Sequence, residues 1–407
     1  MPPKVSRKYT KSKNASKIVS SNLADAKYLF IVESPSKCAK IEHFLGGDYS
    51  CIASKGHFRT IDGLKSIDTN NTFQPKFSLI DEKKEHVEQM KKIISGFSSS
   101  NIYIATDDDR EGEAIAWHIC MQFDLPLKTT KRVLFHEVTK DAIQSCIKNP
   151  TIVNMNLVHA QHARQVLDIL VGYKISPLLW KYLYYNNENS LSAGRCQSPA
   201  LRLIYENHIE KTENIKEFNK INASFFPNKL LFNLTQHLES PDMVLQFLEL
   251  SKGFKHILSV GDYKKSVREP PKPFHTSRLL QVASNVLHMS PKDTMNICQK
   301  LYQGGFITYM RTESTNYSKS YIEGVSKYIE NRFNNKKYIG NIEKLENTDI
   351  NNPHEAIRVT QISLSNLGNC EDRRMNTMYK LIWNNSIESC MSSAIYNVSH
   401  IKITAPL

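Results

Sequence analysis

The 407-residue sequence lacks several features that would each indicate a class of protein. No apolar run is long enough to cross a membrane, and the N-terminus carries charge without the apolar core of a signal peptide. The eight cysteines include no Cys-x-x-Cys pair, which indicates reduced thiols in an intracellular protein. No fixed-period repeat and no Gly-x-x-x-x-Gly-Lys-Ser/Thr phosphate loop is present, so direct use of ATP has no support.

What the sequence does have is the composition of a globular protein and an excess of positive charge. Hydrophobic residues make up 40% and charged residues 23%, which suits a chain of two to four domains with real cores. The 53 Lys and Arg outnumber the 40 Asp and Glu, and the pI is near 9.2, so nucleic acid is the first partner to consider. We expect residues 1–26 to form a disordered basic tail, which acts either as a nuclear address or phosphate-attracting arm or as an inert solvated segment. The cytoplasm and the nucleus both stay open as locations.

An acidic stretch carries the strongest local signal. It puts five carboxylates into the seven residues 107–113, where like charges repel unless a cation or cationic partner is present. The apolar runs 102–105 and 114–123 predict a strand before these acids and a buried helix after them. Because ligands of open α/β sheets sit at the carboxyl ends of strands, the pattern favours a Mg²⁺ site formed by Asp107, Asp109 and Glu111. The alternative is that acids in a first helical turn only complement the helix dipole.

A second strand-to-helix junction lies near the start of the chain. Residues 28–32 have the pattern of a buried strand, and an amphipathic helix is predicted from there through Phe44. Ser34 is a good N-cap and Pro35 a good first helical residue. Glu33 is therefore expected at a strand end, and Lys37 in a first helical turn whose amides favour phosphate.

A tyrosine segment follows the proline-rich break at 269–273. One helix is predicted from Thr276 or Ser277, a second from Ser290 to Gly304, and then a strand over 306–311. Alternation along that strand puts Ile307, Tyr309 and Arg311 on one face. Two helices and a strand are the outline of a winged-helix module, although a single tyrosine among 18 is more often packing than nucleophile.

The sequences of these segments resemble those of one enzyme family. The resemblance is to the signatures of type IA (bacterial-type) DNA topoisomerases, and it lies in Ile31–Lys37, Ala105–His118 and Gly305–Ser314. The Toprim domain of that family gathers acids around magnesium. The resemblance implies ATP-independent cleavage and rejoining of one DNA strand through a 5′-phosphotyrosyl link on Tyr309, with relaxation of negatively supercoiled DNA. It implies that Glu33 exchanges a proton with the 3′ oxygen and that Lys37 and Arg311 stabilise the transferring phosphate.

The resemblance also implies a groove for single-stranded DNA. Arg164 and Asp168 are four residues apart on a predicted helix, where an ordinary surface ion pair is the alternative reading. Residues 191–202 resemble the family's Ser-Ala-Gly-Arg-x-Gln-Ser, which assigns Arg195 and Gln197 to the same DNA. Residues 353–358 resemble its His-Glu-Ala-Ile-Arg, and we expect His354 and Arg358 on one helical face, with His354 on a phosphate when protonated; a capped surface helix is the alternative. The chain departs from the family at Gln165, where a second arginine is common, and after the Ser54–His57 turn.

We expect a multi-domain α/β and α protein that acts as a monomer on DNA. The predicted parts are the tail 1–26, a Toprim α/β domain 27–157, a mostly helical DNA-groove segment 158–212, a β-rich arch segment 213–270, a winged-helix-like domain 271–395 carrying the tyrosine, and a return to the arch at 396–407. The resemblance covers about residues 27–400, and members of the family usually continue further, so we expect a truncated chain. Two alternatives stay open: a DNA-binding or cleaving fragment without complete strand passage, and a Toprim nuclease or primase.

Overall fold

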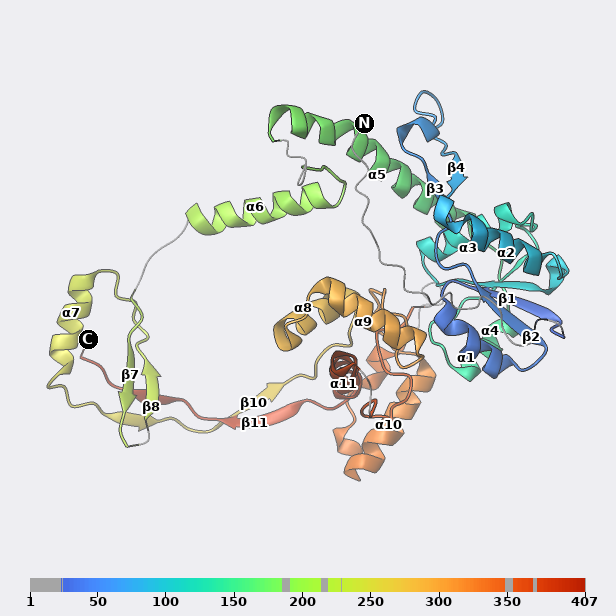
Figure 1. Ribbon diagram of the computed structural model, residues 1–407. Helices are drawn as coiled ribbons and strands as arrows, with labels where there is room; N and C mark the ends of the chain where they lie inside the picture. Colours follow the sequence, from blue (N-terminus) through green and yellow to red (C-terminus); the bar gives the residue numbers. More distant parts are fainter. Residues whose placement is uncertain are drawn as a thin grey trace. The chain divides into compact units, whose positions relative to one another are not determined.

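The computed structural model describes residues 23, 25–184, 191–213, 219–227, 229–347, 354–368 and 372–406 (Figure 1). Nearly all of the predicted basic tail and the Asn-rich loop 186–190 lie outside these residues. The chain divides into two compact units, Met1–Pro177 with Pro271–Met391, and Leu178–Pro270 with Ser392–Leu407. In the described part of the chain, no helix combines the length and the apolar character that crossing a membrane requires.

The first unit begins with a parallel four-stranded sheet. Its order is β2-β1-β5-β6, formed by Tyr49–Ala53, Tyr28–Val32, Ile102–Ala105 and Lys131–Arg132. Residues Leu29 to Val32 are fully buried, because alternate side chains of β1 enter two separate hydrophobic clusters on the two faces of the sheet. The strands predicted at 28–32 and 102–105 are therefore confirmed as hydrogen-bonded neighbours, and both point their carboxyl ends to the same edge.

Helices cover this sheet and extend from it. They are α1 (Pro35–Leu45), α2 (Lys84–Ile94), α3 (Arg110–Gln122) and α4 (Lys140–Lys148), followed by the long α5 (Met155–Tyr182). An antiparallel hairpin of β3 (Arg59–Ile61) and β4 (Phe77–Leu79) interrupts the order, and short 3-10 turns occupy 64–66, 81–83 and 99–101. Pro35 begins α1 as predicted, but the Ser34 hydroxyl contacts Ser36 Oγ at 2.8 Å instead of capping the helix.

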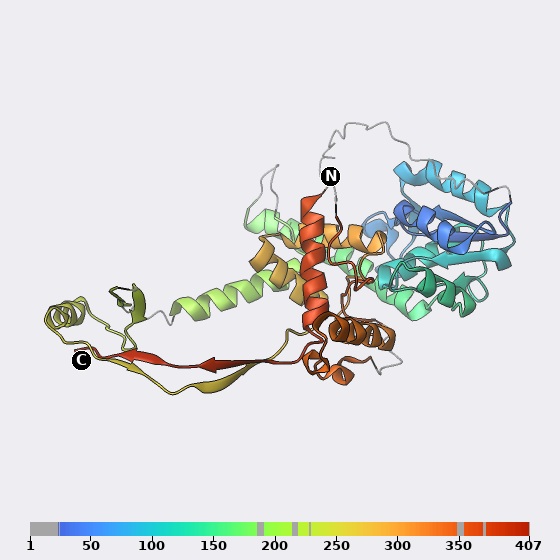
Figure 2. The same cartoon turned by 90° about the horizontal axis from the view of Figure 1, so that it is seen from below.

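The tyrosine part of the first unit is helical. It contains α8 (Thr276–Leu287), α9 (Pro291–Gln303), α10 (Lys319–Phe333) and α11 (Arg373–Glu388), with 3-10 turns at 336–338 and 342–345 (Figure 2). Ser290, where this helix was predicted to start, caps α9 by accepting from the Asp293 amide. Tyr302, Ile307 and Tyr309 share one hydrophobic cluster with Phe30 and Tyr103 of the sheet, so the two parts of this unit have a common core.

The predicted strand over 306–311 is wrong. This segment makes a single β-bridge, between Ile307 and Val359, because its other polar groups bind loops. The Thr308 amide donates to Arg358 O at 2.9 Å, and the Tyr309 amide donates to His136 O at 2.8 Å. The segment is thus held between two stretches that lie far apart in the sequence.

The predicted helix around residues 353–358 is also wrong, and Pro353 itself lies outside the described residues. Residues 354–358 form an extended stretch whose Ala356 and Ile357 amides donate to Asn316 O and Phe274 O, each at 2.7 Å. His354 and Arg358 therefore do not share a helical face.

The second unit holds α6 (Gln197–Glu213), α7 (Pro241–Ser251) and three antiparallel strand pairs. They are β7 (Asn222–Phe225) with β8 (Leu230–Asn233), β9 (Leu258–Val260) with β12 (Ile401–Ile403), and β10 (Lys264–Arg268) with β11 (Ala394–Val398). The strands β7 and β8 form a hairpin, and Asn228 between them lies outside the described residues. Figures 1 and 2 both show β10 and β11 side by side, and the chain re-enters this unit at Ser392.

A buried ion pair fixes the end of the central strands. Arg132 is 1% exposed, and its Nε donates to Glu113 Oε2 at 3.0 Å. The other arms of its guanidinium donate to the carbonyls of Thr106 at 2.8 Å and Asp107 at 2.9 Å. One side chain from β6 therefore ties the chain after β5 to the first turn of α3.

We expect Arg132→Met to lower the free energy of unfolding by about 3–5 kcal/mol, because it leaves the Glu113 carboxylate buried without its partner. Denaturant unfolding followed by circular dichroism measures the change. Lys84→Met is the matched control, since Lys84 pairs with Asp81 on the surface and should leave the midpoint unchanged. Equal midpoints for the Arg132 variant and the wild type would contradict this role.

Candidate functional site

The acidic turn between β5 and α3 is closed by short-range contacts. Asp109 is the N-cap of α3 and accepts from the Gly112 amide at 2.8 Å, while Thr106 Oγ1 donates to Gly112 O at 2.7 Å. A Cβ atom at Gly112 would lie 2.1 Å from Asp107 O, so only glycine fits there. The predicted strand, acidic turn and helix are confirmed, and the turn presents its carboxylates in different directions.

Asp107 faces a buried lysine. The Lys37 ammonium forms an ion pair with Asp107 Oδ1, and the Lys37 side chain is completely buried. The ammonium also lies 4.5 Å from the ring centroid of Tyr302 and 5.5 Å from that of Phe135. Lys37 is in the first turn of α1, as predicted, but its charge is directed into the protein towards the acidic turn.

Tyr309 meets the same turn at Asp109. The phenolic Oη donates to Asp109 Oδ2 at 2.5 Å, and Arg311 Nη1 donates to the same oxygen at 2.9 Å. Tyr309 is 3% exposed and packs edge-on against Tyr302. Burial and then the charges of Asp109 and Asp107 raise the pKa of Tyr309 above its usual value of 10, although Arg311 acts in the opposite direction. The resting phenol is therefore neutral at physiological pH.

Glu33 completes this group of acids. Burial and the negative charges of Asp107 and Asp109 raise the pKa of Glu33 from 4.5 to about 7, against the lowering effect of Lys37 and His57. Glu33 therefore carries a proton in a large fraction of molecules near neutral pH. A carboxyl group in this state can both give and accept a proton.

Glu111 belongs to a different set of contacts. Its Oε2 accepts from His57 Nε2 at 3.2 Å and from Gln161 Nε2 at 3.0 Å, and Arg164 Nη1 lies 3.9 Å from its Oε1. The hydrogen bond from His57 lowers the pKa of Glu111 to about 2, and the hydrogen bond from Gln161 and the charge of Arg164 act in the same direction. Sequence reasoning did not assign His57 or Gln161, although the Ser-x-Gly-His turn pointed to the loop.

Two of the predicted DNA contacts are occupied inside the protein. Arg358 is 5% exposed and donates to both carboxylate oxygens of Glu355, at 2.8 and 2.9 Å, while its Nη1 lies 3.1 Å from Glu137 Oε2. In the second unit, Gln197 Nε2 donates to Ser192 O at 2.9 Å and to Ser192 Oγ at 3.0 Å. Arg195 lies in the turn that precedes α6, and Asp168 lies one helical turn after Arg164 on α5.

The carboxylates suit magnesium by their chemistry. Mg²⁺ takes oxygen ligands, and it uses one or two carboxylates together with phosphate oxygens and water. Burial and then the charges of Asp107 and Asp109 raise the pKa of Glu33, and a divalent cation would relieve the repulsion among these carboxylates. Asp107 and Asp109 are near one another and Glu33, whereas Glu111 faces His57, so the predicted trio is not gathered at one point in this structure.

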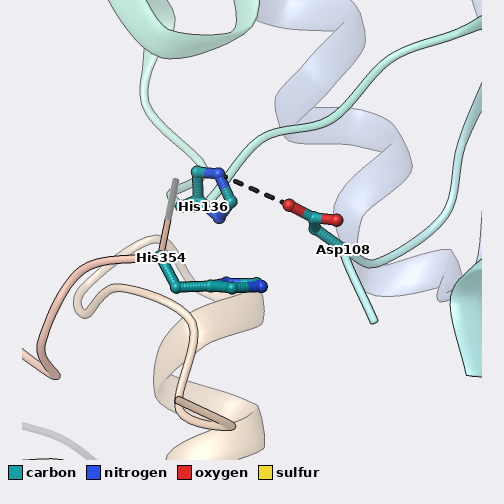
Figure 3. A group of neighbouring side chains, drawn as sticks. All are labelled: Asp108, His136 and His354. Carbon is teal, nitrogen blue, oxygen red and sulfur yellow. Dashed lines mark ion pairs between the residues drawn. The ribbon is translucent and has the colours of Figure 1, made fainter. Parts of the chain in front are cut away.

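A different group of candidate ligand side chains does lie close together. Among the described residues, the one set of three candidate ligands whose ligand atoms all lie within 4.8 Å of one another is Asp108, His136 and His354 (Figure 3). His354 was predicted as a DNA contact, and the other two were not assigned. Nothing in the sequence pattern connects them, because they come from three separate segments.

Comparisons with known proteins agree with this architecture. The Toprim domain model matches residues 28–138, and the DNA topoisomerase model matches residues 152–406. DNA topoisomerase 1 of Campylobacter jejuni is 36% identical over an alignment of 409 positions that covers 92% of this chain and 56% of the relative. Full-length topoisomerase I of Thermotoga maritima has a similar structure, with a TM-score of 0.75 and 31% identity over 93% of this chain and 65% of that one. The chain thus spans little more than half the length of the curated relative.

We expect Glu33→Gln to raise the melting temperature at pH 8 and to leave it nearly unchanged at pH 4. Below pH 4.5 Glu33 is protonated in both the folded and the unfolded chain; as the pH rises to 7 the unfolded chain loses the proton first, so wild-type stability falls. The full penalty, on the order of 2 kcal/mol, is present above pH 7 and absent from the amide variant. Thermal melts across pH 4–8 measure it, with the exposed Glu85→Gln on α2 as control. A pH-independent difference would contradict the assignment.

Proposed function

The chain belongs to the type IA DNA topoisomerase family, and on this premise we propose that it cleaves and rejoins one DNA strand through Tyr309 without ATP and so relaxes negatively supercoiled DNA. The observation that carries the proposal is the contact of Tyr309 and Arg311 with one oxygen of Asp109, in the same unit as Glu33 and Lys37. A nucleophile, a proton donor and two cations thus surround one acidic turn. We propose Tyr309, Glu33, Lys37 and Arg311 as the catalytic residues.

In the proposed cleavage step, Tyr309 Oη attacks the phosphorus and the bond from phosphorus to the 3′ oxygen breaks. The phenolic proton passes to Asp109 Oδ2, which already accepts the hydrogen bond from this hydroxyl. Glu33, with a pKa of about 7, gives its proton to the departing 3′ oxygen. Rejoining reverses these transfers: the 3′ hydroxyl attacks the 5′-phosphotyrosyl link, returns its proton to Glu33, and Tyr309 is released.

Charge stabilisation comes from two sides of the turn. Arg311 is half-exposed beside the tyrosine and is suited to contact a non-bridging phosphate oxygen. The buried charge of Lys37 offsets that of Asp107 close to the reacting atoms. We propose that Asp107, Asp109 and Glu111 hold a magnesium ion once Glu111 leaves His57 and Gln161, and such an ion would supply further positive charge for rejoining.

The proposed substrate is single-stranded DNA held by a monomer. A net charge of +13 favours a polyanion, and Arg164 beside Glu111 is 43% exposed and can reach a phosphate. We propose Arg164, Asp168, Arg195, Gln197, His354 and Arg358 as its further contacts, with Gln197 and Arg358 needing to leave their present partners. The bacterial relative gives no support to the nuclear alternative.

The presence of the acids and the tyrosine in one chain supports cleavage and rejoining, and a relaxation assay distinguishes the complete cycle from a cleaving fragment. A Toprim nuclease or primase would use the same acids but has no need of Tyr309 against them. A nuclease would leave free DNA ends, whereas the proposed enzyme leaves a 5′ phosphate attached to protein. A magnesium-dependent relaxation assay run beside a covalent cleavage assay separates all three.

We expect Tyr309→Phe to lower covalent capture of a labelled single-stranded oligonucleotide by at least about 10³-fold, since the attacking oxygen is gone. Denaturing gels that resolve protein-linked DNA measure this. Tyr302→Phe is the matched control: it keeps the ring that packs on Tyr309 and removes a hydroxyl that only donates to Phe135 O at 3.4 Å. Covalent capture by the Tyr309 variant at the wild-type level would exclude the mechanism.

We expect Asp107→Asn and Asp109→Asn each to slow magnesium-dependent rejoining and relaxation by at least about 10-fold, because each removes one proposed ligand charge. The readout is the rate at which preformed covalent complex disappears after magnesium is added. Asp81→Asn, which alters a surface acid of the same domain, is the control. Unchanged magnesium dependence in both variants would refute the assignment of these acids.

A further inference from the structure

Asp108 points away from the two acids on either side of it. Asp107 contacts Lys37 and Asp109 contacts Tyr309, whereas Asp108 Oδ2 lies 3.5 Å from His136 Nε2. This distance is too long for a hydrogen bond, and among the described residues no hydrogen bond to this buried oxygen is found. The carboxylate therefore faces the imidazole as an ion pair without a hydrogen bond between them (Figure 3).

The two histidines complete a small cluster. Their ring centroids are 5.1 Å apart with an interplanar angle of 73°, and Figure 3 shows both rings on the same side of Asp108. His136 Nδ1 is buried and has no hydrogen-bond partner among the described residues. All three ligand atoms lie within 4.8 Å of one another.

These distances suit a tetrahedral transition-metal ion. Two ligand atoms that are each about 2.0–2.1 Å from zinc lie roughly 3.3 Å apart in a tetrahedral site, close to the 3.5 Å between Asp108 and His136. Two imidazoles and one carboxylate are the ligand set of zinc and similar ions, whereas magnesium prefers oxygen alone. The cluster therefore differs in chemistry from the all-carboxylate group that includes Asp107 and Asp109.

The three residues are also held in position by their backbones. The carbonyl of Asp107, next to Asp108, accepts from Arg132 at 2.9 Å, and the carbonyl of His136 accepts from the Tyr309 amide at 2.8 Å. His354 precedes Ala356, whose amide donates to Asn316 O at 2.7 Å. Three separately anchored segments thus bring the ligands together before any ion binds, which lowers the cost of binding.

The surrounding charges leave the cluster available. Glu137 and Glu355 are the other acids near His136, and Arg358 pairs with both of them. Neither glutamate is therefore free to compete for the imidazoles. A divalent ion would meet one carboxylate and two imidazoles.

We propose that Asp108, His136 and His354 form a binding site for a zinc-like transition-metal ion, distinct from the magnesium carboxylates. The ion joins the acidic turn and the strand-following loop at 136 to the segment at 354, on both sides of the Tyr309 backbone. The bound ion thereby restrains the part of the chain that holds Tyr309. The site takes no part in the attack by Tyr309, but it shares His354 with the proposed DNA contacts, so a bound ion and a phosphate are alternative partners of that side chain.

The test is zinc binding by the whole chain after removal of metals with a chelator, in the presence of excess Mg²⁺. We expect one Zn²⁺ per chain by titration calorimetry, and at least a 10-fold weaker affinity in Asp108→Asn and in His136→Gln. His43→Gln, an exposed histidine on α1, is the matched control and should bind as the wild type does. Asp107→Asn should also keep the zinc site, which separates it from the magnesium acids.

Cobalt substitution gives a second measurement that needs no variant to fold. Co²⁺ bound to the wild-type chain should show the intense visible absorption of a tetrahedral site with nitrogen and oxygen ligands, and Zn²⁺ should displace it. The proposal is overturned if the wild type binds no zinc, if Asp108→Asn and His136→Gln bind it as tightly as the wild type, or if Asp107→Asn alone abolishes binding.

Discussion

Mutual repulsion among the five carboxylates of residues 107–113 is the constraint on which the rest of this structure depends. Each acid is met by a different basic or donating group: Lys37 at Asp107, His136 at Asp108, Tyr309 and Arg311 at Asp109, His57 and Arg164 at Glu111, and Arg132 at Glu113. These partners come from α1, α5, β6 and three loops. Compensating the negative charges of this one turn therefore brings segments from most of the first unit into contact with it.

A shared hydrophobic core makes this compensation possible. Phe30 and Tyr103 of the sheet belong to the same buried cluster as Tyr302 and Tyr309, so the tyrosine segment packs on the sheet rather than touching it only through charges. The cost of burying Lys37 and Asp107 is met by the pair itself and by the aromatic rings beside the ammonium. Packing thus sets the distances at which the acid–base chemistry operates.

The sequence predicted those features whose causes are local. The strand at 28–32, the acidic turn and the α9 cap follow from apolar periodicity and from neighbouring cap residues. The expected strand at 306–311 and helix at 353–358 were wrong because their backbone groups bind distant carbonyls, such as those of His136 and Phe274. The burial of Lys37 and the meeting of Asp108 with two histidines depend on tertiary packing, and single-sequence patterns carry no signal for either.

The near-complete burial of Tyr309 has a kinetic meaning. The hydroxyl of a tyrosine that is 3% exposed, when hydrogen-bonded to an acid, cannot reach a phosphodiester until the surrounding groups move. If Tyr309 is the nucleophile that we propose, its oxygen is kept from stray electrophiles and from small phosphates in solution, and the proposed DNA substrate must supply the binding energy that uncovers it. In that mechanism the step that decides whether a strand is broken is substrate entry, which precedes any change of bonds.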